Sequence, residues 1–264
     1  MALRHAALAG LALGILGFSV PPRAPVTMKY RIESKNETTV DLSAFGQPPQ
    51  QINIGLTSWV RVTLSDTTGG RVVHVVVDSM KYDGAAPIVS QATADSAKGG
   101  SVHGFVDPAG RVKNISQQPA SNAFLADIQG VIHGFFPRVK SGAKTGDGWS
   151  DTVEVTNTTN GANITSKFLI NYTAAGTEQL AGGPALKLTA SSSATVGGTM
   201  ENPQAGTLEV DGKISGTSVS LVGGDGRYLG GSSNSTGDQN MKSPMFPSPI
   251  PVKVIRTVTV TLIP

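Results

Sequence analysis

The sequence predicts an all-β fold made mainly of antiparallel strands, with one α-helix between two groups of strands. Most of the chain after residue 25 alternates apolar and polar residues with a period of two, the spacing of a half-buried strand. The composition is rich in glycine, with 32 residues, and poor in charge, at 15%, which suits many strands joined by tight turns. A segment at 119–136 instead has the spacing of an amphipathic helix. Residues 25–264 are therefore expected to form a single β-rich domain.

Residues 1–24 are predicted to be a signal peptide with a proline-rich exit. Arg4 and His5 precede an apolar run over Ala6–Val20, which has the proportions of a secretory signal and is short of the roughly 20 residues that cross a bilayer. We expect cleavage near Val20–Pro25, export to the periplasm or the cell exterior, and no stable transmembrane segment in the mature chain. An uncleaved anchor and a buried helix are the alternatives.

The first block of strands begins with clear alternation. Strands are predicted at Val26–Leu42 and Ile52–Leu64, and the valine-rich strand Arg71–Tyr82 is expected to be buried on both faces near its middle. Three polar residues interrupt the buried parity of the first strand, where a bend or an overhang is expected: Ser34, Asn36 and Thr38. The small, polar segment 84–100 is predicted to be a loop.

A hairpin and the helix follow. Ser101–Val106 and Arg111–Ser116 flank Asp107-Pro-Ala-Gly110, in which proline and glycine suit the central and closing positions of a turn. The helix is predicted at Pro119–Phe136, and Pro137 ends it. Its apolar stripe should lie on the sheet, either as a movable lid or as a permanently docked element: Phe124, Ile128, Val131 or Ile132, and Phe135.

The second block, 147–264, should contain the remaining strands. Beyond two alternating segments at 149–156 and 163–172, candidates are Pro184–Ala194, Thr207–Val222, Arg227–Ser232 and Val252–Ile263, with Asn240–Pro251 as an extended connection. Gly212 and Gly216 suggest bulges or a sharp bend. Because Phe105–Val112 resembles Leu221–Tyr228, one interpretation is that the halves 25–117 and 147–264 are duplicated and joined by the helix at 119–136. A common hairpin exit would explain the same likeness.

The sequence predicts no catalytic, cofactor-binding or metal-binding residues. Cysteine is absent, which excludes disulfides, thiolate sites and the acylated cysteine of a lipoprotein. The histidines His74, His103 and His133 lack metal-site spacing, and no Gly-x-Ser-x-Gly elbow, phosphate loop or calcium loop occurs. The acidic candidates are interpreted as loop, turn or solvent-facing residues: Asp147, Asp151, Glu154, Asp211 and Asp225. A net charge of +3 without a basic cluster argues against nucleic acid.

Trp149 follows the turn Gly146-Asp-Gly148 and shares its parity with Val153 and Val155. We expect it to be buried where the helix meets the second block of strands, as an anchor of that junction. The alternative is an aromatic ligand contact.

With these motifs assembled, the chain resembles a group of exported bacterial β-rich proteins of unknown function. The resemblance lies in the Phe105–Val112 hairpin, the helix, Phe135-Phe-Pro137 and Gly146–Trp149. The strand order also looks like the half-barrel of periplasmic lipoprotein and glycolipid carriers. That likeness implies a large curved sheet or half-barrel meander of about eleven strands around an apolar cavity, covered here by one helix where the carriers have more.

Three functions remain open from the sequence. The first is a non-enzymatic envelope protein that binds an apolar or amphipathic, lipid-like ligand inside the curved sheet. The second is a structural or adhesive surface protein that binds another protein or itself. The third is a hydrolase with an unrecognised site.

Overall fold

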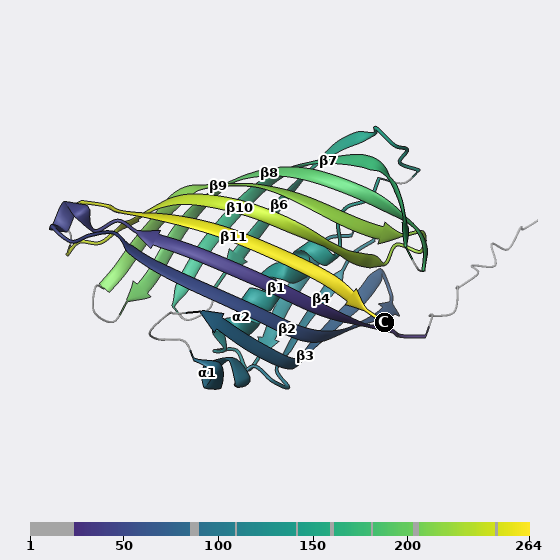
Figure 1. Ribbon diagram of the computed structural model, residues 1–264, viewed down its shortest axis with the longest axis horizontal. Helices are drawn as coiled ribbons and strands as arrows, with labels where there is room; N and C mark the ends of the chain where they lie inside the picture. The colour runs from purple at the N-terminus through teal and green to yellow at the C-terminus, as the bar shows by residue number, and fades with distance from the viewer. Residues whose placement is uncertain are drawn as a thin grey trace, which may run out of the picture.

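One curved antiparallel sheet contains every strand of the described chain (Figure 1). The computed structural model describes residues 24–84, 90–108, 110–140, 142–158, 161–180, 182–202, 206–245 and 248–264. In these residues eleven strands follow the order β5-β4-β3-β2-β1-β11-β10-β9-β8-β7-β6. The predicted half-barrel of about eleven strands is confirmed. The predicted signal peptide lies outside the described residues except for Ala24.

The elements run as follows. The strands are β1 Val26–Val40, β2 Gln50–Thr67, β3 Gly70–Gly84, β4 Ser101–Val106, β5 Val112–Gln118, β6 Gly148–Asn157, β7 Ala162–Leu180, β8 Gly183–Asn202, β9 Gly206–Gly223, β10 Tyr228–Lys242 and β11 Ile250–Ile263. The helices are α1 Gln91–Asp95 and α2 Ala123–Ile132, with 3-10 turns η1 Ser43–Phe45 and η2 His133–Phe135.

The half-barrel has two different ends. We call the end with the β2–β3, β4–β5 and β9–β10 turns the mouth, and the end with the β1–β2 and β10–β11 connections the distal end. In Figure 1 the mouth lies toward the right, near the C-terminus, and η1 marks the distal end at the left. Helix α2 lies inside the curve of the sheet, so the concave face is the one that it contacts.

The alternation of apolar and polar residues along each strand gives the sheet a mainly apolar concave face and a mainly polar convex face. In β1, Tyr30 and Ile32 are buried on the concave face, whereas Lys29 and Arg31 are exposed on the convex face. The expectation that β3 is buried on both faces near its middle is wrong, because Val76 on the convex side is only half-buried and Val72, nearer the start of the strand, is 40% exposed. Period-two burial holds there instead, since α2 covers only the concave side.

Gly212 and Gly216 do not form bulges in β9, contrary to expectation. Both stay in register with β8 and β10. A Cβ atom at Gly212 would lie 2.5 Å from the backbone oxygen of Asp238, closer than atoms can approach. Glycine here lets β10 approach closely on the inside of the curve, so these residues serve the curvature of the sheet.

The predicted helix exists but begins later than Pro119. The Asn122 side chain accepts hydrogen bonds from the backbone N–H groups of Phe124 and Leu125 and so caps α2 at residue 123. The predicted apolar stripe is buried on β1, β2, β3 and β4, and Leu125 is 0% exposed. This is the packing of a docked core helix.

The aromatic ring of Phe135 fixes the end of this helical segment to two strands. Its centroid lies 5.0 Å from that of Tyr30 in β1 and 5.3 Å from that of Tyr228 in β10. The Tyr30 hydroxyl donates to the Tyr228 carbonyl oxygen at 2.7 Å, and burial raises the pKa of both tyrosine hydroxyls. The cluster therefore joins α2 to both halves of the sheet.

Two other boundaries differ from expectation. The predicted loop 84–100 contains α1, because the Ser90 hydroxyl caps it by accepting from the Thr93 N–H. The predicted connection 240–251 is shorter, because β10 continues to Lys242 and Pro251 already pairs with Asn240. Proline is tolerated there because it lies near the start of a strand.

The two hairpins that resemble each other in sequence are also closed by the same hydrogen bonds. In the β4–β5 turn, the Asp107 N–H donates to the Arg111 oxygen, and the Gly110 N–H donates to the Asp107 oxygen. Gly223, Gly226 and Arg227 repeat both bonds in the β9–β10 turn. Both turns lie at the mouth. Duplication of the halves stays a prediction.

Docking of α2 can be tested with two leucines. We expect Leu125→Ala to lower the free energy of unfolding by about 2–5 kcal/mol, because it leaves a cavity under the helix. The control is Leu169→Ala on the convex face, where Leu169 is 47% exposed and the expected loss is under about 0.5 kcal/mol. Urea unfolding would measure both, and equal small losses would contradict a docked helix.

Candidate functional site

Helix α2 covers only one part of the concave face. The main buried cluster joins α2 to β1–β4 and includes residues of β10 and β11 near Phe135. On the far side of the sheet, a small second cluster contains Ala174, Leu188 and Val222, with Trp149 packed against it. The concave face of β6–β10 toward the distal end belongs to neither cluster. This difference in cover defines the candidate site.

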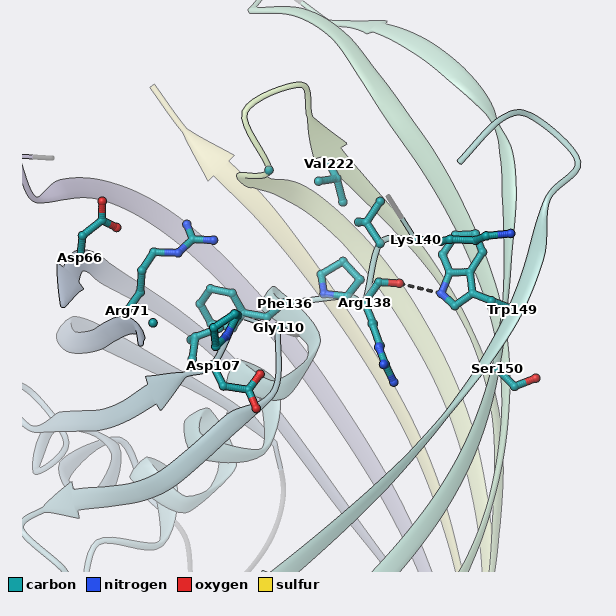
Figure 2. Close-up of a pocket in the computed structure, with 16 residues that line it drawn as sticks. Asp66, Arg71, Asp107, Gly110, Phe136, Arg138, Lys140, Trp149, Ser150 and Val222 are labelled. Carbon is teal, nitrogen blue, oxygen red and sulfur yellow. Dashed lines mark hydrogen bonds between the residues drawn. The ribbon is translucent and has the colours of Figure 1, made fainter. Parts of the chain in front are cut away.

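A pocket of about 690 Å³ opens at the mouth. Figure 2 shows it between the hairpin turns on one side and the start of β6 on the other, with the segment after α2 crossing it. Its lining combines aromatic and aliphatic groups with charged side chains: Asp66, Arg71, Val106, Asp107, Phe136, Pro137, Arg138, Val139, Lys140, Trp149 and Val222. The pocket therefore lies at the mouth of the half-barrel, beside the segment that follows α2.

The charges of the mouth pocket are unequally paired. Asp107 lies 2.8 Å from the ammonium group of Lys113, and Arg138 forms an ion pair with Asp151. Among the described residues, no ion pair occupies the side chains of Arg71 and Lys140, and both line the pocket. Asp66 also lines the pocket, directly opposite Arg71 across β2 and β3, and has no ion pair among the described residues, so the rim carries one unpaired carboxylate beside two unpaired cations.

Trp149 anchors the junction after the helix, as one sequence-based interpretation expected, and the ligand-contact alternative stays a prediction. Its indole Nε1–H donates to the Arg138 carbonyl oxygen at 2.7 Å, and its ring stacks on Tyr172 with centroids 5.6 Å apart. It thus anchors the segment after the helix to β6 and β7. The expectation of full burial is wrong: Trp149 is half-buried because one side of the ring lines the mouth pocket.

Asp151 is the clearest site residue that the sequence analysis misplaced. It was expected to face solvent, but it is 8% exposed on the concave face. The guanidinium group of Arg138 lies against its carboxylate. A charge can be buried here because the segment after α2 supplies its partner. The parity shared with Trp149 and Val153 was the signal that could have placed it.

A polar band crosses the middle of the concave face. In one cross-strand row Arg256 of β11 lies between Asn36 of β1 and Ser235 of β10, and the row continues to Gly216, Ser192, Ile170 and Asp151. The neighbouring row contributes Ser34, Ser233 and Ser218. The polar interruption predicted to bend β1 is therefore part of this band, and β1 continues through it unbroken.

Helix α2 meets this band through one ion pair. The Arg256 guanidinium donates through Nη2 to Asp127 of α2. On the other side of the band, Arg138 meets Asp151 in the same cross-strand row. Two ion pairs thus tie the helix and its following segment to opposite parts of the sheet.

Toward the distal end the concave face becomes apolar. One cross-strand row contains Val153, Phe168, Ala194 and Ile214, and it continues through Gly237 to Val254. Val153, Phe168 and Ile214 are half-buried, although they project to the inside of the curve. The concave face therefore offers an apolar strip beside a polar band, which matches the two parts of an amphipathic molecule.

Two of the three described histidines lie away from this face, whereas His133 begins η2 directly after α2. His74 and His103 pair across β3 and β4 on the convex side, with stacked rings 4.3 Å apart. Burial first, then the charge of His103, lowers the pKa of His74, and burial lowers that of His133. Ser101 Oγ lies 3.2 Å from His103 Nε2, but no carboxylate of the described chain bonds the other ring nitrogen. A serine triad is not assembled there.

The other acidic candidates are scattered. Glu154 pairs with Lys167, and Asp211 pairs with Lys242, on the convex face. Asp225 accepts from Arg227 within the β9–β10 turn, and Asp147 accepts from the Lys144 N–H. These positions agree with the loop, turn and solvent-facing roles expected of them. In the ranges that the structure describes, no three His, Cys, Asp or Glu residues gather as a metal site.

No protein-family model matches the chain, and no curated protein matches its sequence significantly. What the fold and the site define is a half-barrel β protein whose concave face is only half covered. Across the described parts of the chain, no helix combines the length and apolar character needed to cross a membrane.

The partly buried Arg138–Asp151 pair can be tested against an exposed one. We expect Arg138→Met to lower the free energy of unfolding by about 1–3 kcal/mol, because Asp151 would remain buried without its partner. Lys167→Met breaks the exposed pair with Glu154, whose side chain is 59% exposed, and should cost under about 1 kcal/mol. Chemical denaturation of both variants is the measurement, and a larger loss for Lys167→Met would refute this account of the junction.

Proposed function

We propose that this protein is an exported, non-enzymatic envelope protein that binds one amphipathic, lipid-like molecule on the concave face of its sheet. One observation carries the proposal: the apolar row of Val153, Phe168, Ala194 and Ile214 lies beside a polar band and outside the cover of α2. Apolar surface of this kind is stabilised when a ligand removes it from water.

The mouth pocket is the entry in this proposal. Its volume of about 690 Å³ falls within the range of small-molecule sites, about 300–1,000 Å³. Phe136, Val139 and Trp149 supply apolar contact, while Arg71 and Lys140 lie at the rim. A single hydrocarbon chain passing this pocket would meet the polar band first and the distal apolar row next.

Export is part of the same proposal and rests on the N-terminal sequence. The apolar run Ala6–Val20 and the prolines after it have the pattern of a secretory signal. A carrier in the envelope meets lipids and their breakdown products in an aqueous compartment, where shielding an apolar chain from water is useful. Peptides from exported protein that contain Arg4 and His5 would contradict cleavage.

Adjacent residues of β7 provide a matched test of binding. Phe168 faces the concave side, whereas Leu169 is 47% exposed on the convex face. We expect the wild-type protein to bind dansyl-undecanoic acid, and Phe168→Ser to weaken binding about tenfold to a hundredfold. The loss of one buried aromatic contact, about 1.5–3 kcal/mol, sets that range.

Leu169→Ser is the control and should leave the dissociation constant unchanged. Fluorescence titration measures all three proteins, and circular dichroism confirms that each is folded. If wild-type protein takes up no probe and carries no ligand from its native source, the carrier proposal is wrong. The structural or adhesive alternative would then be the better one.

A further inference from the structure

The concave face of β7–β11 carries one charged side chain in the described residues, and it is Arg256. Residues of the same parity in these strands are apolar, small or neutral polar. Placing a guanidinium group on the inner surface of the sheet costs desolvation free energy. Its position between the apolar row and the mouth therefore calls for a role beyond packing.

The donors of Arg256 are incompletely used. Nη2 bonds to Asp127, but Nε is buried and has no partner among the described residues. The Arg256 side chain is 30% exposed and that of Asp127 is 19% exposed. A guanidinium group has five N–H donors in a planar fork that fits an anionic pair of oxygen atoms. The site can therefore accept more acceptor oxygens than Asp127 supplies.

A second unpartnered donor lies in the neighbouring row. Ser34 of β1 is 2% exposed, and its hydroxyl has no hydrogen-bond partner in the described chain. Its strand places Asn36 directly opposite Arg256. Buried polar groups without partners are uncommon and call for an explanation. Arg256 Nε and Ser34 Oγ are thus two buried polar atoms without partners in neighbouring rows of the polar band.

The face of α2 that meets Arg256 is unusually open. Ala123, Asp127, Gly130 and Gly134 follow a spacing of four, three and four residues, so they share one face of the helix. Beyond its own helix, a Cβ atom at Gly130 would approach only Arg256 Nη1, at 3.8 Å, and one at Gly134 would meet nothing within 4 Å. These glycines reduce helix propensity by about 1 kcal/mol each relative to alanine, and they leave room beside the guanidinium group.

We propose that Arg256 binds the anionic head group of a single-chain amphiphile, and that Asp127 occupies this position in the free protein. This inference rests on the proposed function and names its ligand class. The head group competes with the Asp127 carboxylate for the guanidinium donors, and the hydrocarbon chain lies along the distal apolar row. Carboxylate and phosphate heads share the required oxygen atoms.

The test compares three probes that have the same twelve-carbon chain and different head groups. Isothermal titration calorimetry with dodecanoate, dodecyl phosphate and dodecanol is performed on the full exported chain. We expect each anion to bind at least about tenfold more tightly than dodecanol, which is the factor expected of a charged hydrogen bond. The tighter anion identifies the source of the head group as a fatty acid or a phospholipid derivative.

Three substitutions test whether the preference for anions depends on Arg256 and Asp127. Arg256→Gln should abolish the difference between anions and dodecanol, and Arg256→Lys should keep part of it. Asp127→Asn should tighten anion binding about tenfold without changing dodecanol binding, because it removes the competing carboxylate. This gain of affinity cannot arise from misfolding. Lys253→Gln is the control, because Lys253 lies on the convex face of the same strand.

The outcomes distinguish failure of the head-group inference from failure of the proposed carrier function. If anions and dodecanol bind equally and Arg256→Gln changes neither, the head-group inference is wrong while the carrier function stands. If Asp127→Asn weakens anion binding, competition at Arg256 is contradicted. If no twelve-carbon probe binds the wild-type protein, the proposed function itself fails.

Discussion

The burial of α2 on strands β1–β4 is the interaction on which the rest of the structure depends. Eleven strands at their usual spacing span about 48 Å around the sheet. A ten-residue helix is only about 15 Å long and 10 Å wide. Helix α2 can therefore cover a few strands and no more. The uncovered concave face is a consequence of this difference in size, and curvature of the sheet shields it only in part.

Aromatic packing and two ion pairs fix α2 and the segment after it to the concave face. Phe135 packs between Tyr30 and Tyr228, and the ion pairs of Asp127 with Arg256 and of Arg138 with Asp151 hold the chain across the middle of the sheet. Beyond these contacts the inner surface is apolar, with Phe168 and Ile214 half-buried and Ala194 buried. The buried core and the proposed ligand site thus occupy different parts of one concave face, so the proposed ligand would bind without disturbing the core.

The sequence predicted the fold well because strand alternation and the stripe of α2 are local patterns. It located every strand, the hairpins and the helix, but it ended β7 at 172, β8 at 194 and β10 at 232, well before their actual ends at 180, 202 and 242. Its errors at Pro119 and residues 84–100 came from the capping side chains of Asn122 and Ser90. The candidate site was not predictable in the same way. Arg256, Asp127 and Asp151 are far apart in sequence, and only the register of a curved sheet brings their rows together. The alternation in the sequence places Asp151 and Arg256 on the same side of their strands as apolar residues. Their burial could be explained only once the structure showed the ion-pair partners Arg138 and Asp127.

The most direct test of the central claim is paramagnetic broadening of isoleucine methyl resonances by a doxyl-labelled fatty acid. Ile164, Ile170 and Ile214 project to the concave face, whereas Ile255 is 40% exposed on the convex face. The account predicts selective broadening of the three concave methyl groups and an unchanged Ile255 signal. Broadening of Ile255 alone, or of none of the four, would contradict a binding site inside the half-barrel.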